Sequence, residues 1–514
     1  MKKIIRIILY LVVADISYVN AQTDSLIRFS DLKYYSDFEK DAIREFVKLN
    51  SDTFNLFMAI DEKMTPEDAA WRRDIYSSVF EDLYNSKVDT KKINKKIKLT
   101  YSYVHDKFLK KYNDNVFFPV IFHTGVYNCV TASMLYAMIF DQMGIPYSVK
   151  ASSNHVYLVA NPGPKSIVIE TTNPGFEQQI FTGEFKQQYV NYLRTSKMIS
   201  ESEYKNKSVE EIFEEKFNEV RDAEFRNLPG FQYYNKALMK LQNNETNEAL
   251  DLCQKAYFFY PDNQVKTLLN TCLLFYLEKC NFDKVSDIDY LAQLSRFENT
   301  DQDAIVGIFN NIIYNHLQYT GREPLCDSLN VRLVNQISEK KLADELSFTY
   351  NLQMAYRFQN SDKIEKYVAN ALDIKGNHRD ARIMMENYIN RKLYNINNSD
   401  VLLDTLGQLI KRYDNELLNP ILHDHKLRAY LQKANDAFGQ RRITEGNKYL
   451  LLFEKESEKP VKSKMLIPLV ENTYRTVAVY YFYKGNKFKA ESYIDRGLDF
   501  VPHSRLIQSA VYSN

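Results

Sequence analysis

The chain has 514 residues, of which 45% are hydrophobic and 26% charged, a composition that excludes both a polytopic membrane protein and a wholly disordered chain. The formal net charge is +1, and this balance argues against a nucleic-acid-binding protein. Gly and Pro together account for 27 residues, about 5% of the chain against roughly 12% in average proteins. Since such scarcity of turn residues favours long helices, the composition predicts a multidomain, mostly α protein.

The N-terminus has the pattern of a signal peptide. Three basic residues among the first six precede the apolar run 7–14, and Val19-Asn20-Ala21 supplies the small residues that a signal peptidase recognises. We therefore expect residues 1–21 to be a signal peptide and the protein to be exported, to the periplasm or the extracellular space. No Cys follows the apolar run as in a bacterial lipoprotein, and we expect no membrane span after signal removal.

Residues 22–112 have the pattern of an N-terminal helical region. Apolar positions at helical spacing predict a helix over 37–47, and Thr65-Pro66 followed by acidic residues is typical of a helix start. Helical spacing continues over 91–111. The lysines of 91–98 belong to this stretch, and we interpret them as the exposed face of a helix rather than as a nucleic-acid site.

Residues 113–195 combine one helix with short strands. An apolar helix is predicted over 128–143, ended by Gly144 as a left-handed cap and by Pro146. The pattern predicts an α+β core in which this helix packs on a small antiparallel sheet. The strands expected in the sheet are 147–150, 155–160 and 167–170, with a turn at 161–164 between the last two.

Residues 196–228 are expected to be a helical linker and 229–514 to be helical repeats. Small residues and a proline recur at the offsets of a 34-residue tetratricopeptide repeat, at Tyr233, Ala237, Ala249, Ala256 and Pro261 and again at Ala478, Tyr481, Gly485, Ala490, Gly497 and Pro502. A degenerate third copy is indicated by Ala371 and Gly376. We expect roughly five to eight helical pairs, forming an all-α solenoid whose concave face binds a protein partner.

The cysteines direct attention to one position. They number five, an odd count without metal-ligand spacing, so we expect no disulfide framework, no metal site and no cofactor. Cys129 begins a predicted helix with Asn128 as its N-cap, where unpaired backbone N–H groups and the helix dipole favour a thiolate. The remaining thiols are interpreted as core residues: Cys253, Cys272, Cys280 and Cys326.

Two further residues complete a candidate catalytic site with Cys129. His155 opens one predicted strand and Glu170 closes the next, so antiparallel pairing can bring both to the start of the helix. A thiol nucleophile needs a base, and the base needs a group that fixes its tautomer. We predict Cys129 as nucleophile, His155 as base and Glu170 as the orienting acid, with the Cys129 N–H as one oxyanion donor.

In their order, these motifs resemble the core of transglutaminase-like proteins of the papain-like superfamily, and the likeness is to bacterial members coupled to tetratricopeptide repeats. It covers 113–195, and the repeats add 229–514. The resemblance implies a Cys129–His155–Glu170 triad that acts on amide or ester bonds through an acyl-enzyme thioester. The motifs that carry it are 128–133 at the helix start, Gly144-Ile145-Pro146 after the helix, 154–159 on one strand and 169–175 on the next.

Two positions depart from the commonest pattern of that family. The acid is Glu170 rather than Asp, and Val156-Tyr157 follows His155 where Ala-Trp is common. The longer acid changes the geometry of its bond to the base. Because the aromatic residue is missing, the substrate preference of the family is not transferred to this chain. Protein cross-linking is therefore not implied by the resemblance.

Two functions stay open from the sequence. The first is an exported thiol-dependent amidohydrolase or acyltransferase that acts on a peptide or protein substrate. The second is a non-catalytic scaffold in which the core and the repeats bind other exported proteins. His123 is a weaker candidate for an oxyanion donor, since 117–124 equally fits a loop, and Asn154 is interpreted as a turn residue.

Overall fold

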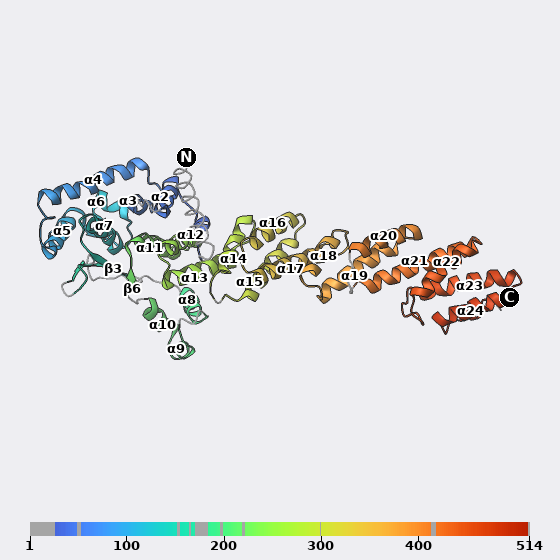
Figure 1. Cartoon of the computed structure of the whole chain (residues 1–514). Helices are drawn as coiled ribbons and strands as arrows, with labels where there is room; N and C mark the ends of the chain where they lie inside the picture. Colours follow the sequence, from blue (N-terminus) through green and yellow to red (C-terminus); the bar gives the residue numbers. More distant parts are fainter. Residues whose placement is uncertain are drawn as a thin grey trace, which may run out of the picture. The chain divides into compact units, whose positions relative to one another are not determined.

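The structure is a computed structural model that describes residues 26–48, 53–151, 155–163, 166–169, 183–195, 199–217, 221–298, 300–412 and 418–511. The predicted signal peptide, residues 1–21, lies outside the described residues. The chain forms two compact units (Figure 1). The first runs to Ile308 and includes Asp327–Ser338, and the second contains Phe309–Cys326 and everything from Glu339 onward.

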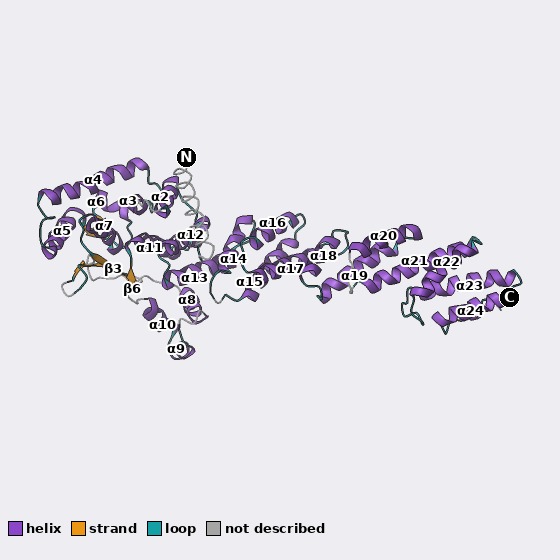
Figure 2. Ribbon diagram, in the orientation of Figure 1, coloured by secondary structure: helices purple, strands orange, loops and turns teal. Residues whose placement is uncertain are grey.

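The first part of the chain holds all the described strands, drawn in orange in Figure 2, together with many helices. Its strands are β1 (Lys111–Tyr112), β2 (Val126–Tyr127), β3 (Tyr147–Ala151), β4 (Val156–Ala160), β5 (Ile167–Ile169) and β6 (Arg221–Ala223). Its helices are α2 (Asp37–Val47), α3 (Thr53–Met58), α4 (Pro66–Asn85), α5 (Ile93–Phe108), α6 (Ile121–Thr124), α7 (Cys129–Gln142), α8 (Gly183–Thr195), α9 (Glu201–Asn206), α10 (Val209–Phe217), α11 (Leu228–Gln242), α12 (Thr246–Phe259), α13 (Asn263–Lys279) and α14 (Ile288–Leu294).

Short 3-10 turns lie at η1 (Phe29–Asp31), η2 (Phe118–Val120), η3 (Phe225–Asn227) and η4 (Val285–Asp287). All the regular elements described after α14 are helices. These helices are α15 (Gln302–Leu317), α16 (Glu323–Val334), α17 (Lys340–Arg357), α18 (Ile364–Ile374), α19 (Arg379–Tyr394), α20 (Ser399–Arg412), α21 (Asn419–Gly439), α22 (Ile443–Glu456), α23 (Ile467–Tyr483), α24 (Lys487–Phe500) and α25 (Arg505–Gln508). The expected mostly α fold with a small antiparallel sheet is confirmed, and no described helix has the length and apolar character needed to cross a membrane.

The antiparallel sheet has one more strand than the sequence predicted. Its order is β5-β4-β3-β6, and β3 pairs with β4 so that Tyr147 faces Ala160 and Ala151 faces Val156. The added strand, β6, lies within 196–228, the expected helical linker, which thus contains a short strand beside its helices. Three residues are too few to show a period of two, so only pairing with β3 reveals this strand.

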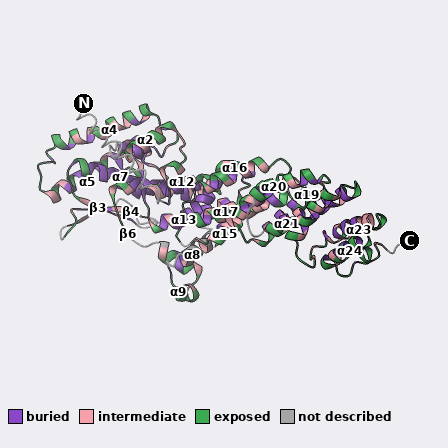
Figure 3. Ribbon diagram, turned by 45° about the vertical axis from the view of Figure 1, so that its right-hand side comes forward, coloured by how far each residue is buried: buried purple, intermediate pink, exposed green. Residues whose placement is uncertain are grey.

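Helix α7 is the core element of the first unit. All its residues from Cys129 to Phe140 are buried, as Figure 3 shows in purple, which explains why the segment is apolar on every face. One side packs on β4, where the Ser133 hydroxyl donates to the Val156 carbonyl at 3.1 Å. The predicted end is confirmed, since Gly144 follows α7 with φ +62°.

Helices α4 and α5 also bind α7. The Tyr76 hydroxyl donates to the Met138 carbonyl at 3.3 Å, and the Tyr136 hydroxyl donates to the Tyr101 carbonyl at 3.1 Å. At the C-terminal end, the Lys96 ammonium donates to the Met143 carbonyl at 2.5 Å, where the helix dipole favours a cation. One lysine of the basic 91–98 stretch therefore caps the core helix.

The first helical pair, α11 and α12, lies in the first compact unit. The divisions predicted at 196 and 229 do not coincide with the division between the compact units. Helix α11 contacts α7, and α13 contacts α8. The expected helix-crossing residues Ala237, Ala249 and Ala256 are fully buried in the pair.

A buried ion pair joins the first helical pair to the N-terminal helix α2. The Lys255 ammonium lies 2.7 Å from the Glu39 carboxylate, with the two side chains 0% and 1% exposed. The same carboxylate accepts hydrogen bonds from the Tyr233 hydroxyl at 2.9 Å and from the Tyr35 backbone N–H at 2.7 Å. Burial lowers the pKa of Lys255, and the neighbouring Glu39 opposes that change.

Small residues set the helix crossings of the second unit. A Cβ atom at Gly446 would stand 2.4 Å from the Phe438 ring, and one at Gly497 would stand 2.9 Å from Tyr474. Ala478 is also fully buried where α23 packs against α24. The helices predicted from these small residues are therefore present, and they cross at close distance.

Removing one partner of the buried ion pair should destabilise the first unit strongly. Lys255→Met leaves the Glu39 charge buried without its cation, and we expect the free energy of unfolding to fall by about 3–5 kcal/mol. The double variant Glu39→Gln/Lys255→Met, which keeps an acceptor for Tyr233, should recover most of this loss. Urea unfolding, followed by the fluorescence of Trp71, the only tryptophan, measures the free energy of unfolding of both variants. Equal losses of stability in the single and the double variant would contradict the argument.

Acid should weaken α21 through one histidine. Burial and the neighbouring Arg428 lower the pKa of His425 from 6.5 to about 4, and the neutral ring donates to Asn390 Oδ1 at 2.9 Å. Since the unfolded state binds a proton that the folded state excludes, stability should fall by up to about 3 kcal/mol as the pH drops from 6.5 to 4. Hydrogen exchange of peptides from α21 measures this loss of stability. In the His425→Gln variant, the stability of α21 should depend less on pH.

Candidate functional site

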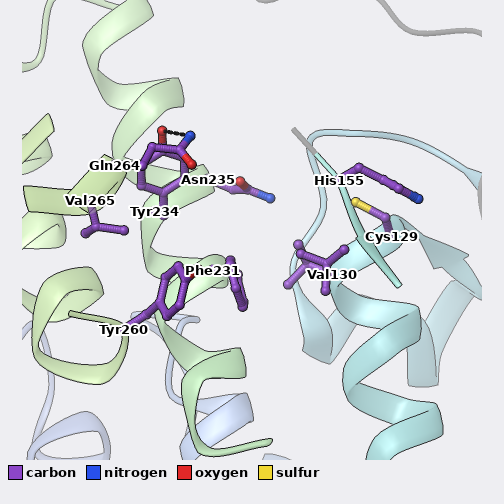
Figure 4. A pocket seen from close by; sticks show the side chains of 10 residues that line it. Cys129, Val130, His155, Phe231, Tyr234, Asn235, Tyr260, Gln264 and Val265 are labelled. Carbon is purple, nitrogen blue, oxygen red and sulfur yellow. Dashed lines mark hydrogen bonds between the residues drawn. The ribbon is translucent and has the colours of Figure 1, made fainter. Parts of the chain in front are cut away.

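Cys129 and His155 line the same small pocket in the first unit (Figure 4). Cys129 is the first residue of α7 and is 6% exposed, and His155 directly precedes β4. The structure thus brings together two of the three residues that the sequence predicted as catalytic. The pocket has a volume of about 20 Å³, which is room for one water-sized group.

Asn128 holds the start of α7 in place with four hydrogen bonds. Its side-chain oxygen accepts from the Thr131 N–H at 2.9 Å, and the Thr131 hydroxyl accepts from the Asn128 N–H at 2.9 Å. Its side-chain nitrogen donates to the carbonyls of Asp114 at 3.0 Å and Val116 at 2.9 Å. The predicted N-cap is confirmed, and it also ties the preceding loop to the helix that carries Cys129.

Tyr112 is a residue of the site that sequence reasoning missed. It lies on β1, which runs parallel to β2 so that Tyr112 faces Tyr127 with ring centres 5.6 Å apart. Gly125 permits this pairing, because it ends α6 at φ +69° and a Cβ there would stand 2.5 Å from Lys110 Cγ. A two-residue strand paired across thirteen intervening residues leaves no periodic signal in the sequence.

The Tyr112 phenol lies near enough to the Cys129 side chain for each to affect the ionisation of the other. Burial is the largest cause that raises the pKa of Tyr112, followed by the nearby charges of Cys129 and Asp114 and hydrogen bonds to both side chains. A phenol with a raised pKa stays protonated at neutral pH and can donate a hydrogen bond. A donor at this place stabilises a negative sulfur, in addition to the effect of the helix dipole.

The imidazole of His155 is oriented by an aromatic neighbour. Its ring stacks on the Tyr157 ring with centres 5.5 Å apart and planes 22° from parallel. The next residue, Val156, is bound to α7 through its carbonyl, as described above. The strand that follows His155 is thus fixed to the helix that begins with Cys129.

The third predicted catalytic residue, Glu170, lies outside the described residues, as does Asn154. The described part of β5 ends at Ile169, which pairs with Leu158 of β4. His123 is exposed on α6, where its ring meets Trp71 edge-on with centres 6.5 Å apart, and it does not line the pocket with Cys129. The geometry thus gives no support to His123 as an oxyanion donor.

The wall opposite Cys129 comes from α11, α13 and the connection before α13. Figure 4 shows these side chains across the pocket from Cys129 and His155. Sequence reasoning interpreted the aromatic residues of this region as packing between repeats, because nothing in a helical repeat pattern indicates that its first helix borders a site. The wall residues are Phe231, Tyr234, Asn235, Tyr260, Gln264 and Val265.

A polar network fixes this wall to the sheet. Arg221 of β6 donates to Gln264 Oε1 at 2.9 Å and to Asp262 Oδ1 at 3.0 Å. The Gln264 amide in turn donates to the Tyr234 hydroxyl at 2.9 Å. Since Arg221 pairs with Ala151 of β3, the two sides of the pocket are connected through hydrogen bonds.

The other four cysteines are separate from the site. Cys253 and Cys272 are fully buried with their sulfurs 3.7 Å apart, and Cys326 is fully buried as well. Burial raises the pKa of Cys253 and of Cys280, which keeps these thiols protonated near neutral pH. None of the five cysteines, all of which lie in the described part of the chain, forms a disulfide bond.

Comparisons with known proteins do not identify the chain. No family model matches it, and no similar protein was found among curated proteins or among solved structures. Within the described residues, no group of three or more His, Cys, Asp or Glu side chains is arranged to hold a metal ion. The pocket geometry is therefore the main basis for a functional assignment.

Loss of the phenol should make the Cys129 thiol harder to ionise. Hydrogen bonds to charged groups contribute roughly 1.5–3 kcal/mol, so Tyr112→Phe should move the midpoint of the alkylation rate against pH upward by about one unit. The measurement is the rate of Cys129 modification by iodoacetamide between pH 5 and 9. Tyr127→Phe, which changes the neighbouring ring, is the matched control, and an equal shift in both variants would contradict a specific role of Tyr112.

Proposed function

We propose that the protein is a thiol-dependent amidohydrolase or acyltransferase that acts on peptide-like amide bonds. The observation that carries this proposal is that Cys129, at the N-terminus of a rigidly capped helix, and His155, beside the adjoining strand, line one pocket. Backbone N–H groups and the helix dipole favour the thiolate, and an imidazole is the usual base for a thiol nucleophile.

The reaction has two half-steps. The Cys129 sulfur attacks the substrate carbonyl carbon, and its proton passes through His155 to the leaving amine as the carbon–nitrogen bond breaks. Water or a second amine then attacks the thioester, His155 removes its proton, and the thiol is released with a carboxylic acid or a new amide. The Cys129 N–H and the Tyr112 hydroxyl are the candidate donors to the tetrahedral oxyanion.

Glu170 is included in the proposal as the group that orients His155. It directly follows Ile169, whose strand pairs with the strand that His155 precedes. A carboxylate in contact with the second ring nitrogen of the base would fix its tautomer and stabilise the imidazolium. The assignment of this role rests on the sequence motif.

We further propose that the region around α7 is a transglutaminase-like core and that the helices after it are tetratricopeptide-like repeats. Support comes from the order of elements, with a Cys at the start of the core helix, an antiparallel sheet against it and a His at the start of one strand. In the repeats, support comes from small buried residues at the crossings of α11 with α12 and of α23 with α24. The signal-peptide pattern further supports export.

The alternative function is a non-catalytic scaffold for other exported proteins. It retains the same fold and requires no ionised thiol at neutral pH. The helices of the second unit would bind a protein partner in either case, so the state of the Cys129 thiol separates the two functions.

Alkylation of all five cysteines by iodoacetamide, measured by peptide mass spectrometry against pH, tests the proposal without a known substrate. We expect Cys129 to react at pH 6 at least tenfold faster than an ordinary thiol of pKa about 8.5, because it is held as a thiolate. His155→Ala should slow this reaction tenfold or more. Cys253, Cys272, Cys280 and Cys326 are internal controls and should react slowly in the folded chain.

A Cys129 that reacts no faster than an ordinary thiol, with or without His155, would exclude the enzyme and favour the scaffold. Tyr157→Leu provides a matched comparison, because it removes the ring that stacks on His155 and leaves the base present. We expect it to slow alkylation less than His155→Ala does.

A further inference from the structure

The pocket wall on α11 and α13 contains features that packing alone does not require. Gly230 has no side chain at a point where a Cβ would stand 2.6 Å from Tyr260 Cβ, and this close approach brings the Phe231 and Tyr260 rings to 4.4 Å between centres. Because the hydrogen bonds from Arg221 through Gln264 also fix Tyr234, the wall is rigid on both of its helices.

The space between this wall and Cys129 is small, and apolar side chains border it on both sides. Its volume of about 20 Å³ accommodates a water molecule or a methyl group. Val130 and Val156 border it on the side of Cys129, and Phe231 and Val265 border it on the opposite side. A group that enters here beside the reacting carbonyl must therefore be very small.

One polar side chain faces this space from the opposite wall. Figure 4 shows the carboxamide of Asn235 directed toward Cys129 and His155. Among the residues that the structure describes, Asn235 has no side-chain hydrogen bond, in contrast to the neighbouring Tyr234, which accepts one from Gln264. A carboxamide offers both a donor and an acceptor, the two groups that pair with the N–H and C=O of a peptide unit.

We infer that this wall is the acyl-donor subsite, that it selects a peptide with glycine or alanine at the residue whose carbonyl Cys129 attacks, and that Asn235 binds the peptide main chain. This inference rests on the proposed function and specifies its substrate class. Phe231 is assigned the size limit, since its ring borders the space on the wall opposite Cys129. The first helical pair is then a part of the substrate site and not only a platform for partners.

Peptidyl chloromethyl ketones test this inference on the full chain. The Cys129 sulfur forms a bond to the methylene carbon of the probe, and chloride leaves. We compare the acetyl-alanyl, acetyl-leucyl and acetyl-phenylalanyl probes, with iodoacetamide as the reference for thiolate reactivity. In the unmodified protein, the alanyl probe should react at least tenfold faster than the other two, after normalisation to iodoacetamide.

Two variants at Phe231 test the size limit. Phe231→Ala should raise the rate with the leucyl probe about tenfold and reduce the alanyl preference to threefold or less. Phe231→Leu is a smaller change at a buried position and should also reduce the preference for the alanyl probe. It replaces Phe231→Ala in the test if the alanine variant does not fold. An unchanged preference in a folded variant at this position would overturn the assignment of the wall.

Asn235→Ala tests binding of the main chain. It should slow all three peptidyl probes about tenfold and leave the iodoacetamide rate within twofold, because the thiolate is not affected. Gln242→Ala, an exposed position on the same helix, is the matched control and should change neither rate. A similar loss with iodoacetamide would mean that Asn235 acts on the nucleophile, which would overturn its role in binding the peptide.

The outcomes separate this inference from the proposed function. Fast iodoacetamide labelling at pH 6 with equal rates for the three peptidyl probes would retain the enzyme and reject the subsite. Slow labelling of Cys129 by iodoacetamide would reject the proposed function and the subsite together.

Discussion

The buried pair of Lys255 and Glu39 is the interaction on which the arrangement of the first unit depends. Two opposite charges without access to water are tolerated only at hydrogen-bonding distance, so the pair fixes α12 against α2 with little freedom. Tyr233 donates to the same carboxylate and extends this constraint to α11. The helical pair is thereby held in the same compact unit as α7, and its first helix lines the pocket with Cys129.

The candidate site follows from this placement, because its two walls come from distant parts of the sequence. Cys129 and His155 belong to the core helix and the sheet, whereas Phe231 and Asn235 come from the first helical pair. Arg221 joins the two walls through Gln264, so the pocket has a defined width. A thiol at a helix start becomes a selective site only when such an opposite wall limits what reaches it.

Local signals made much of the core predictable. The start of α7 is determined by Asn128 and its end by Gly144, which are both short-range features of capping. The strands of the antiparallel sheet were visible from alternation and turn residues, except for β6, whose three residues depend on pairing with β3. Tyr112 was not predictable for the same reason, since it meets Cys129 only through the pairing of β1 with β2.

The sequence by itself determined the helical character of the chain, the cap that positions Cys129, and the placement of Cys129 at a helix start and of His155 before a strand. Each of these depends on residues within a few positions of one another, where backbone geometry and hydrogen bonding act directly. The tertiary structure alone decided that the first helical pair lines a pocket with Cys129, that His123 does not line it, and that the volume of this pocket is about 20 Å³. These features depend on long-range contacts such as Lys255 with Glu39, and no local pattern encodes which distant residue becomes the partner of a buried charge.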